Sequence, residues 1–298
     1  NKLSVSSLKR SLIQLHVFVF LAGLTAPIGN LIQLNGLNLV FYRMLLTVLA
    51  LLPIYILHQR TNEVILKDKA KLMLIGVLIA IHWVCFYGSI KLANVSVALV
   101  CISCVGLFTA ILEPIIFKTK FIWNELLIGL LSLIGILFIF QFDIHFRTGI
   151  LVGLVSSLFA AIFTILNKRI TSQYTTQTIQ TFEMLGGLSF LTIVLFGIKN
   201  IQHTNFTYPT QSDWFWLIIL SLICTVLANY LMLSALKKIS AFTLNVTLNL
   251  EPVYGIIIAI ILFQEHKQMG MGFFIGMSLI AISVLLQMLR VLRQQKTK

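Results

Sequence analysis

Four charged side chains lie inside long apolar segments of the sequence: Arg43, Glu113, Glu183 and Glu251. At the centre of a lipid-facing helix such a residue costs about 2.5–3.5 kcal/mol on insertion scales, so it normally faces a protein interior or water. A guanidinium or a carboxylate in that setting can bind a charged ligand, exchange protons or pair with another buried group. These four residues are therefore the first candidates for chemistry.

Glu251 is the candidate nearest the middle of its apolar segment, and Pro252 follows it directly. Proline has no amide hydrogen to donate to the carbonyl of Leu248, and its ring strains the helix at that point. The freed carbonyl beside a carboxylate predicts a polar notch near the membrane midplane. We expect Glu251 to line a central cavity and to bind substrate or a proton; the alternative is a structural role, hydrogen-bonded to a neighbouring asparagine.

Other polar and aromatic side chains at depth complete the predicted site. Trp83 and Tyr87 share one helix face, as do Asn245 and Asn249, and an amide in hydrocarbon needs a partner. The aromatic residues could equally be packing, and His82 could be held by an ordinary hydrogen bond. The predicted substrate-binding set is Asn30, His82, Trp83, Tyr87, Asn167, Tyr230, Asn245, Asn249 and Glu251.

The elements that position these residues follow from composition. Of the 298 residues, 58% are hydrophobic and 10% are charged, whereas soluble chains have roughly 25% charged residues. This composition excludes a soluble enzyme and a nucleic-acid-binding protein. Long segments that are apolar on every side predict helices and not strands. The expected spans are 12–32, 37–58, 70–92, 95–117, 122–141, 148–168, 176–199, 212–236, 241–263 and 269–290.

The basic residues predict the orientation of these ten spans. Of the 22 Lys and Arg, 17 fall at the chain ends and in alternate loops, and four fall in the other loops. The positive-inside rule then places both termini in the cytoplasm. The first span lacks a small-residue cleavage site, so we expect it to be retained. A location in the bacterial cytoplasmic membrane, as a monomer or homodimer surrounded by lipid, is the corresponding expectation.

A shift of 146 residues aligns the two halves of the chain. It places Ser132–Ile136 on Ser278–Ile282 and Gly106 on Pro252. Residues 1–145 and 146–298 are therefore predicted to be five-helix repeats, and an odd helix number makes them inverted in the membrane, as in many secondary transporters. We expect both halves to bend at Gly106 and Pro252. Arg43 and Glu183, mates at a shift of 140, are predicted to act in gating or substrate binding. The alternative is that each forms a structural ion pair or hydrogen bond with a neighbouring helix.

Several segments resemble the drug/metabolite transporter superfamily, EamA type. They are Leu248–Gly255 with Phe263–Glu265, Ala235–Ala241, and Phe41-Tyr42-Arg43. The resemblance covers essentially the whole chain and implies transport of small metabolites, commonly amino acids or related compounds and often outward, through a cavity between the halves. In the first half Gly106 replaces the expected proline, and Glu113-Pro114 comes a turn or two late.

The leading hypothesis is a secondary transporter that works by alternating access, with no covalent chemistry and no cofactor. The sequence holds no Walker lysine loop and no HExxH, which favours gradients over ATP as the energy source. Cys101 and Cys104 form a C-x-x-C, which we interpret as helix packing rather than a metal site. The alternatives are a lipid or polyprenyl-phosphate flippase of the same fold and a membrane-embedded lipid-modifying enzyme.

Overall fold

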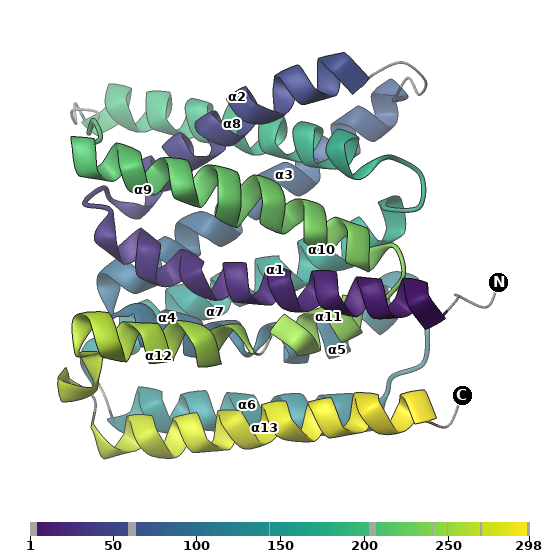
Figure 1. Ribbon diagram of the computed structural model, residues 1–298. Coiled ribbons are helices and arrows are strands. Elements are labelled where there is room, and N and C mark those ends of the chain that lie inside the picture. The colour runs from purple at the N-terminus through teal and green to yellow at the C-terminus, as the bar shows by residue number, and fades with distance from the viewer. Residues whose placement is uncertain are drawn as a thin grey trace.

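The computed structural model is a bundle of helices that run side by side along one axis (Figure 1). It describes residues 5–58, 64–142, 144–202, 207–239, 241–248, 250–268 and 270–296, and within these every regular element is helical. The elements are α1 (Val5–Leu31), α2 (Gly36–His58), α3 (Leu66–Leu92), α4 (Val95–Ile102), α5 (Val105–Phe117), α6 (Trp123–Phe142), η1 (Ile144–Phe146), α7 (Arg147–Ile170), α8 (Thr176–Gln202), α9 (Gln211–Ser221), the π-helix η2 (Leu222–Leu227), α10 (Ala228–Leu236), α11 (Ala241–Leu248), α12 (Glu251–Phe263), η3 (Glu265–Gln268) and α13 (Met271–Lys296).

The helices fall on all ten predicted apolar ranges. Among the described residues, seven helical stretches are long and apolar enough to cross a membrane, the first being Ile13–Leu31 and the last Gln211–Leu236. The apolar helices Trp123–Ile139, Glu251–Phe263 and Met271–Ser283 are shorter than a full crossing. The all-helical architecture is therefore confirmed, and the number of ten crossings stays a prediction.

The outer surface of the bundle is apolar. Leu57, Ile193 and Ile261 are 76%, 72% and 71% exposed. A soluble monomer rarely exposes large contiguous apolar patches, but acyl chains solvate such side chains as well as a protein interior does. The surface therefore fits a chain surrounded by lipid.

Two apolar segments are interrupted near their middle. The first is broken at Ser103 and Cys104, between α4 and α5, and the second between α11 and α12. The predicted interruptions are thus present, but each lies two or three residues before the expected position. Gly106 and Pro252 are the second residues of α5 and α12. The break before Pro252 has a physical reason. Proline is tolerated in the first turn of a helix, where its missing amide hydrogen would have no intrahelical partner.

The two interrupted segments correspond residue for residue. Adding 146 to the bounds of α4 and α5 gives the bounds of α11 and α12. Even the ends agree, because α5 and α12 both stop at a left-handed residue, Lys118 with φ 55° and Gln264 with φ 53°. This agreement supports the proposed repeat, since a shared sequence pattern has produced the same break and the same cap twice.

Glycines let several helices approach closely. A Cβ atom on Gly149 would lie 2.5 Å from that of Ala93, and one on Gly153 would lie 2.8 Å from that of Cys101. A Cβ on Gly276 would lie 2.3 Å from the carbonyl oxygen of Gly135, which joins α13 to α6 along one edge of the bundle (Figure 1). Small residues therefore allow close contact between helices at these positions.

Gly186 provides a test of this packing on α8. A Cβ atom there would lie 2.2 Å from the carbonyl oxygen of Met73 on α3, whereas one on Gly197 of the same helix meets nothing within 4 Å. Gly186→Ala should destabilise the protein by about 1–3 kcal/mol, because the backbone of α3 has to move away. Gly197→Ala is the matched control and should be neutral or slightly stabilising. Thermal unfolding in detergent measures both; equal melting temperatures would contradict this packing.

The beginning of α1 and the end of α13 lie at the same end of the bundle, here called the termini end; the opposite end is the far end (Figure 1). The exposed Lys120 follows α5 at the termini end, and the exposed Lys267 follows α12 at the far end. The predicted orientation places the termini end in the cytoplasm.

Cysteine labelling in intact cells tests that orientation. With the four native cysteines replaced, Lys267→Cys should react with a membrane-impermeant maleimide from outside, because the far end faces out. Lys120→Cys should react only after the cells are opened. Labelling of Lys120→Cys in intact cells, with Lys267→Cys protected, would reverse the orientation.

Candidate functional site

A cavity of about 90 Å³ lies inside the bundle and is lined by side chains from both halves of the chain. Its polar lining includes Thr25 on α1, Arg43 on α2, His82 on α3, Thr164 on α7, Asn229 on α10 and Glu251 on α12. Apolar and aromatic side chains fill the spaces between these groups. An apolar cavity with a few convergent polar groups is the usual form of a small-molecule site.

The two predicted repeats contribute to the cavity in pairs. Five pairs of lining residues are separated by 146 positions: Phe18 with Thr164, Trp83 with Asn229, Phe86 with Met232, Ile102 with Leu248, and Val105 with Glu251. Two of these pairs flank the helix breaks α4/α5 and α11/α12. The cavity thus lies where the two interrupted segments meet, as expected for a site between inverted repeats.

Glu251 lines this cavity from the first residue of α12 and is 7% exposed. The break before it turns α12 into a separate helix, so Glu251 lies at a helix N-terminus, where a negative charge is favoured. Its repeat mate Val105 holds the same position on α5. Because Val105 is apolar, the Glu251 carboxylate makes the two breaks electrically different.

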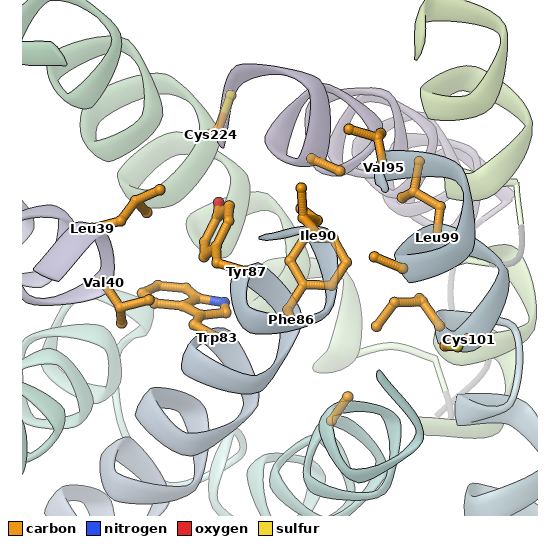
Figure 2. Close-up of a cluster of buried hydrophobic side chains, with 14 of the residues drawn as sticks. Leu39, Val40, Trp83, Phe86, Tyr87, Ile90, Val95, Leu99, Cys101 and Cys224 are labelled. Atoms are coloured by element: carbon orange, nitrogen blue, oxygen red, sulfur yellow. The ribbon is translucent and has the colours of Figure 1, made fainter. Parts of the chain in front are cut away.

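Arg43 also lines the cavity, although it is only 3% exposed. Its guanidinium lies 3.8 Å from the centre of the Trp83 ring. Nη1 donates to the Tyr87 hydroxyl at 2.8 Å, Nε to Thr225 Oγ1 at 2.7 Å, and Nη2 to the Cys224 carbonyl at 3.2 Å. Figure 2 shows Trp83, Tyr87 and Cys224 grouped in this part of the core.

The π-helix η2 supplies two of the three hydrogen-bond acceptors of Arg43, the Thr225 hydroxyl and the Cys224 carbonyl. Thr225 Oγ1 donates in turn to the carbonyl of Leu220, five residues earlier, at 2.7 Å. Gln180 on α8 donates to the carbonyls of Thr225 and Val226 at 3.2 and 3.1 Å. Wide π turns of this kind are frequent at functional sites. Here the Thr225 hydroxyl and the carbonyls of Cys224, Thr225 and Val226 accept hydrogen bonds from side chains of α2 and α8.

His82 is tied to α7 by Ser156. Its Nδ1 lies 2.8 Å from Ser156 Oγ and 2.9 Å from the Ser156 carbonyl, and Ser156 Oγ donates to the His82 carbonyl at 3.0 Å. The imidazole therefore presents its other edge to the cavity. The interpretation of His82 as hydrogen-bonded and its predicted contact with substrate are compatible.

Acidic residues hold the bundle together at both ends. At the far end, Asp213 on α9 accepts the backbone amide of Gln33, after α1, at 2.8 Å. At the termini end, Asp68 on α3 accepts the Tyr174 hydroxyl, after α7, at 2.6 Å, and this bond raises the pKa of Tyr174. Each contact joins the start of a helix in one half to the loop after the first helix of the other.

Glu265 and Lys168 add one further contact at each end. Glu265 accepts the backbone amides of Val95 and Ser96 at 2.9 and 3.0 Å, which caps α4 at the far end. Lys168 Nζ donates to the carbonyl of Leu236, 2.7 Å away, and to that of Ile239 at the termini end. Glu265 therefore adds a contact between the two halves at the far end, whereas the Lys168 contact lies within the second half.

The other predicted site residues are spread around the cavity. Tyr87 is fully buried and reaches the site through Arg43. Asn30 is partly buried near the end of α1, and Tyr230 is 38% exposed; neither lines the cavity. The residue beside Tyr230, Asn229, points inward instead, because successive helix residues differ by about 100°.

Asn167 and Glu183 are buried together on α7 and α8, outside the cavity lining. Asn249 lies outside the described residues, and Asn245 lies in α11 with a side chain outside the described part. The sequence reasoning did not select Thr25, Phe86 or Thr164. The sequence held one weak signal for Thr164. It is a polar residue inside an apolar run, and it lies one helical turn before Asn167 on the same helix face.

Known proteins resemble this chain in sequence and in fold. The model of the EamA-like transporter family matches residues 10–141 and 147–289. The chain belongs to the EamA-like transporter family. As a member of this family with several membrane-length helices, it is a multi-pass membrane protein.

A Bacillus subtilis protein named as the uncharacterized transporter YetK is 29% identical over 105 residues, which are 35% of this chain and 31% of that protein. The matched part thus spans about a third of the relative. A solved crystal structure matches 96% of this chain and 98% of its own with a TM-score of 0.66 and 12% identity. At that identity the likeness concerns the fold alone.

Thr225→Val tests the Arg43 network of this EamA-like protein. Valine keeps the shape but leaves the Nε hydrogen of Arg43 without its acceptor, so we expect a loss of about 1–3 kcal/mol of unfolding free energy. The control is Thr192→Val, since Thr192 Oγ1 only donates within its own helix, to Leu188. It should change stability by less than about 0.5 kcal/mol. Equal melting temperatures for the two variants would show that the network does not hold Arg43.

Proposed function

We propose that this protein is a secondary transporter that moves a small metabolite, an amino acid or a related compound, across the bacterial cytoplasmic membrane. The observation that carries the proposal is one cavity lined by Arg43, Glu251 and aromatic side chains. A guanidinium suits a carboxylate and a carboxylate suits an ammonium group. A zwitterion therefore satisfies both ends of the site at once.

The size of the cavity supports a small substrate. About 90 Å³ is well below the roughly 300–1,000 Å³ of sites for drug-sized ligands. The cross-half contacts at both ends agree with a closed conformation of the bundle. The substrate class, export as the direction, and alternating access all belong to this proposal.

The inverted-repeat arrangement supplies the mechanism. We infer ten crossings, two five-helix repeats at 1–145 and 146–298, and cytoplasmic termini; the two separate family matches and the paired cavity lining support this. Opening the far end requires release of Asp213 from Gln33, and opening the termini end requires release of Asp68 from Tyr174. The breaks at α4/α5 and α11/α12 give each half a point at which to bend.

A flippase for lipid or polyprenyl phosphates is the second candidate from the sequence. Arg43 is the cation that such a headgroup would need. However, Glu251 lines the same small cavity, and a carboxylate there repels a phosphate group. The composition of the cavity therefore favours a substrate with both signs of charge.

Transport by reconstituted protein tests this function. Each proteinogenic amino acid, radiolabelled, is offered to proteoliposomes, and we expect the wild type to move at least one of them. Glu251→Gln is nearly isosteric and should lower that rate at least about tenfold, because truncating one buried charged partner costs about 2–5 kcal/mol.

Tyr230→Phe is the control, since the Tyr230 side chain lies off the cavity and should leave the rate unchanged. Near wild-type rates and an unchanged pH profile in Glu251→Gln would end the assignment of Glu251 to the site. No uptake of any amino acid by the wild type would refute the substrate class.

A further inference from the structure

A second buried polar pair lies outside the cavity. Glu183 on α8 is 1% exposed and Asn167 on α7 is fully buried. Neither lines the cavity, but Phe163 and Thr164 do, and they lie one helical turn before Asn167 on the same face of α7. The pair is therefore adjacent to the cavity, on the side of the termini end, and separate from Arg43 and Glu251.

Three polar atoms of this pair have no hydrogen-bond partner: Oε1 of Glu183 and both Oδ1 and Nδ2 of Asn167. Burial is the largest influence on the Glu183 carboxyl group, and the Asn167 side chain is the polar neighbour close enough to influence it as well. A buried polar atom without a partner costs about 1–3 kcal/mol. Two such side chains facing each other indicate that a small species completes the site.

Helix packing prevents Glu183 from leaving this position. A Cβ atom on Gly76 would lie 1.8 Å from the carbonyl oxygen of Glu183, so α3 and α8 are in direct backbone contact here. Glu183 is the eighth residue of the 27-residue α8. A short glutamate side chain that far into a tightly packed helix cannot reach the aqueous interface, so its carboxyl group stays among protein atoms.

The surroundings of Glu183 offer it no counter-charge. Among the described side chains, the helices beside it carry these titratable residues: Tyr42, Arg43 and Tyr55 on α2; Lys67, Asp68, Lys69, Lys71, His82, Cys85, Tyr87 and Lys91 on α3; Arg147, Lys168 and Arg169 on α7; and Tyr230 on α10. None of them acts on the Glu183 carboxyl group, which is influenced by burial and by Asn167. Arg43, His82 and Lys168 are bound to other partners described above, and Lys69 lies over the ring of Phe182. Within the described residues no salt bridge reaches Glu183. An ionised carboxylate here would be a bare buried charge, which is strongly unfavourable.

We propose that Glu183 and Asn167 form a proton-binding site distinct from the substrate cavity. With a proton on the carboxyl group, its O–H donates to Asn167 Oδ1, and Asn167 Nδ2 donates to the other carboxyl oxygen. All three atoms are then satisfied and no net charge is buried. Loss of the proton leaves a charge that requires water, so deprotonation is coupled to separation of α7, α8 and α3 at this level. The site itself does not depend on the identity of the substrate.

Infrared difference spectroscopy tests the site without any substrate. The protein in liposomes is titrated with acid and base, and the carbonyl band of protonated carboxyl groups is followed. We expect the wild type to show such a band that disappears in Glu183→Gln and persists in Glu251→Gln. In Asn167→Leu, which has the same shape without the amide, the same band should shift because its hydrogen bond is lost.

Two results would overturn the proposal. One is a Glu183→Gln spectrum identical to that of the wild type at every pH, which would mean that Glu183 is ionised and bound to a cation or water. The other is an unshifted band in Asn167→Leu, which remains informative if Glu183→Gln fails to fold. A failure of amino-acid transport leaves both outcomes unaffected, so the two proposals can be separated.

Discussion

The burial of one guanidinium constrains much of this structure. Arg43 is almost completely enclosed, and in hydrocarbon each of its N–H groups needs a partner. Ordinary helices have no free carbonyls to offer in their middle. The chain meets the requirement with the π-helix η2, with the Tyr87 hydroxyl and with the face of Trp83. These contacts join α2, α3 and the α9–α10 segment, and they place one positive charge beside the cavity.

The second requirement is a place where helices can be broken without exposing backbone to lipid. Irregular backbone is tolerated at membrane depth only where protein or a water-filled cavity surrounds it. The breaks α4/α5 and α11/α12 satisfy this, because residues on both sides of each break line the cavity. The same breaks give Glu251 its position at a helix start. Charge, cavity and bending points are thus consequences of one arrangement of two similar halves.

The sequence predicted the helices well because uninterrupted apolar runs leave no other structure. It also placed Glu251, Trp83 and His82 at the cavity, since polar groups in such runs need an interior. The contacts of Arg43 could not be predicted in the same way, because its acceptors include groups of a π-helix and no sequence periodicity marks that turn. Sequence alone could not separate Tyr230 from its neighbour Asn229, which lines the cavity, because one step along a helix turns the side chain by about 100°.

We propose that the cavity recognises a positive and a negative group together. Thermal stabilisation of the purified protein is the direct test, because a ligand at a hundred times its Kd adds about 2.7 kcal/mol to the stability of the folded state. We expect an amino acid to raise the melting temperature. The matching amine, which lacks the carboxylate, and the matching N-acetyl acid, which lacks the charged amine, should not raise it. Equal stabilisation by either of these derivatives would contradict it.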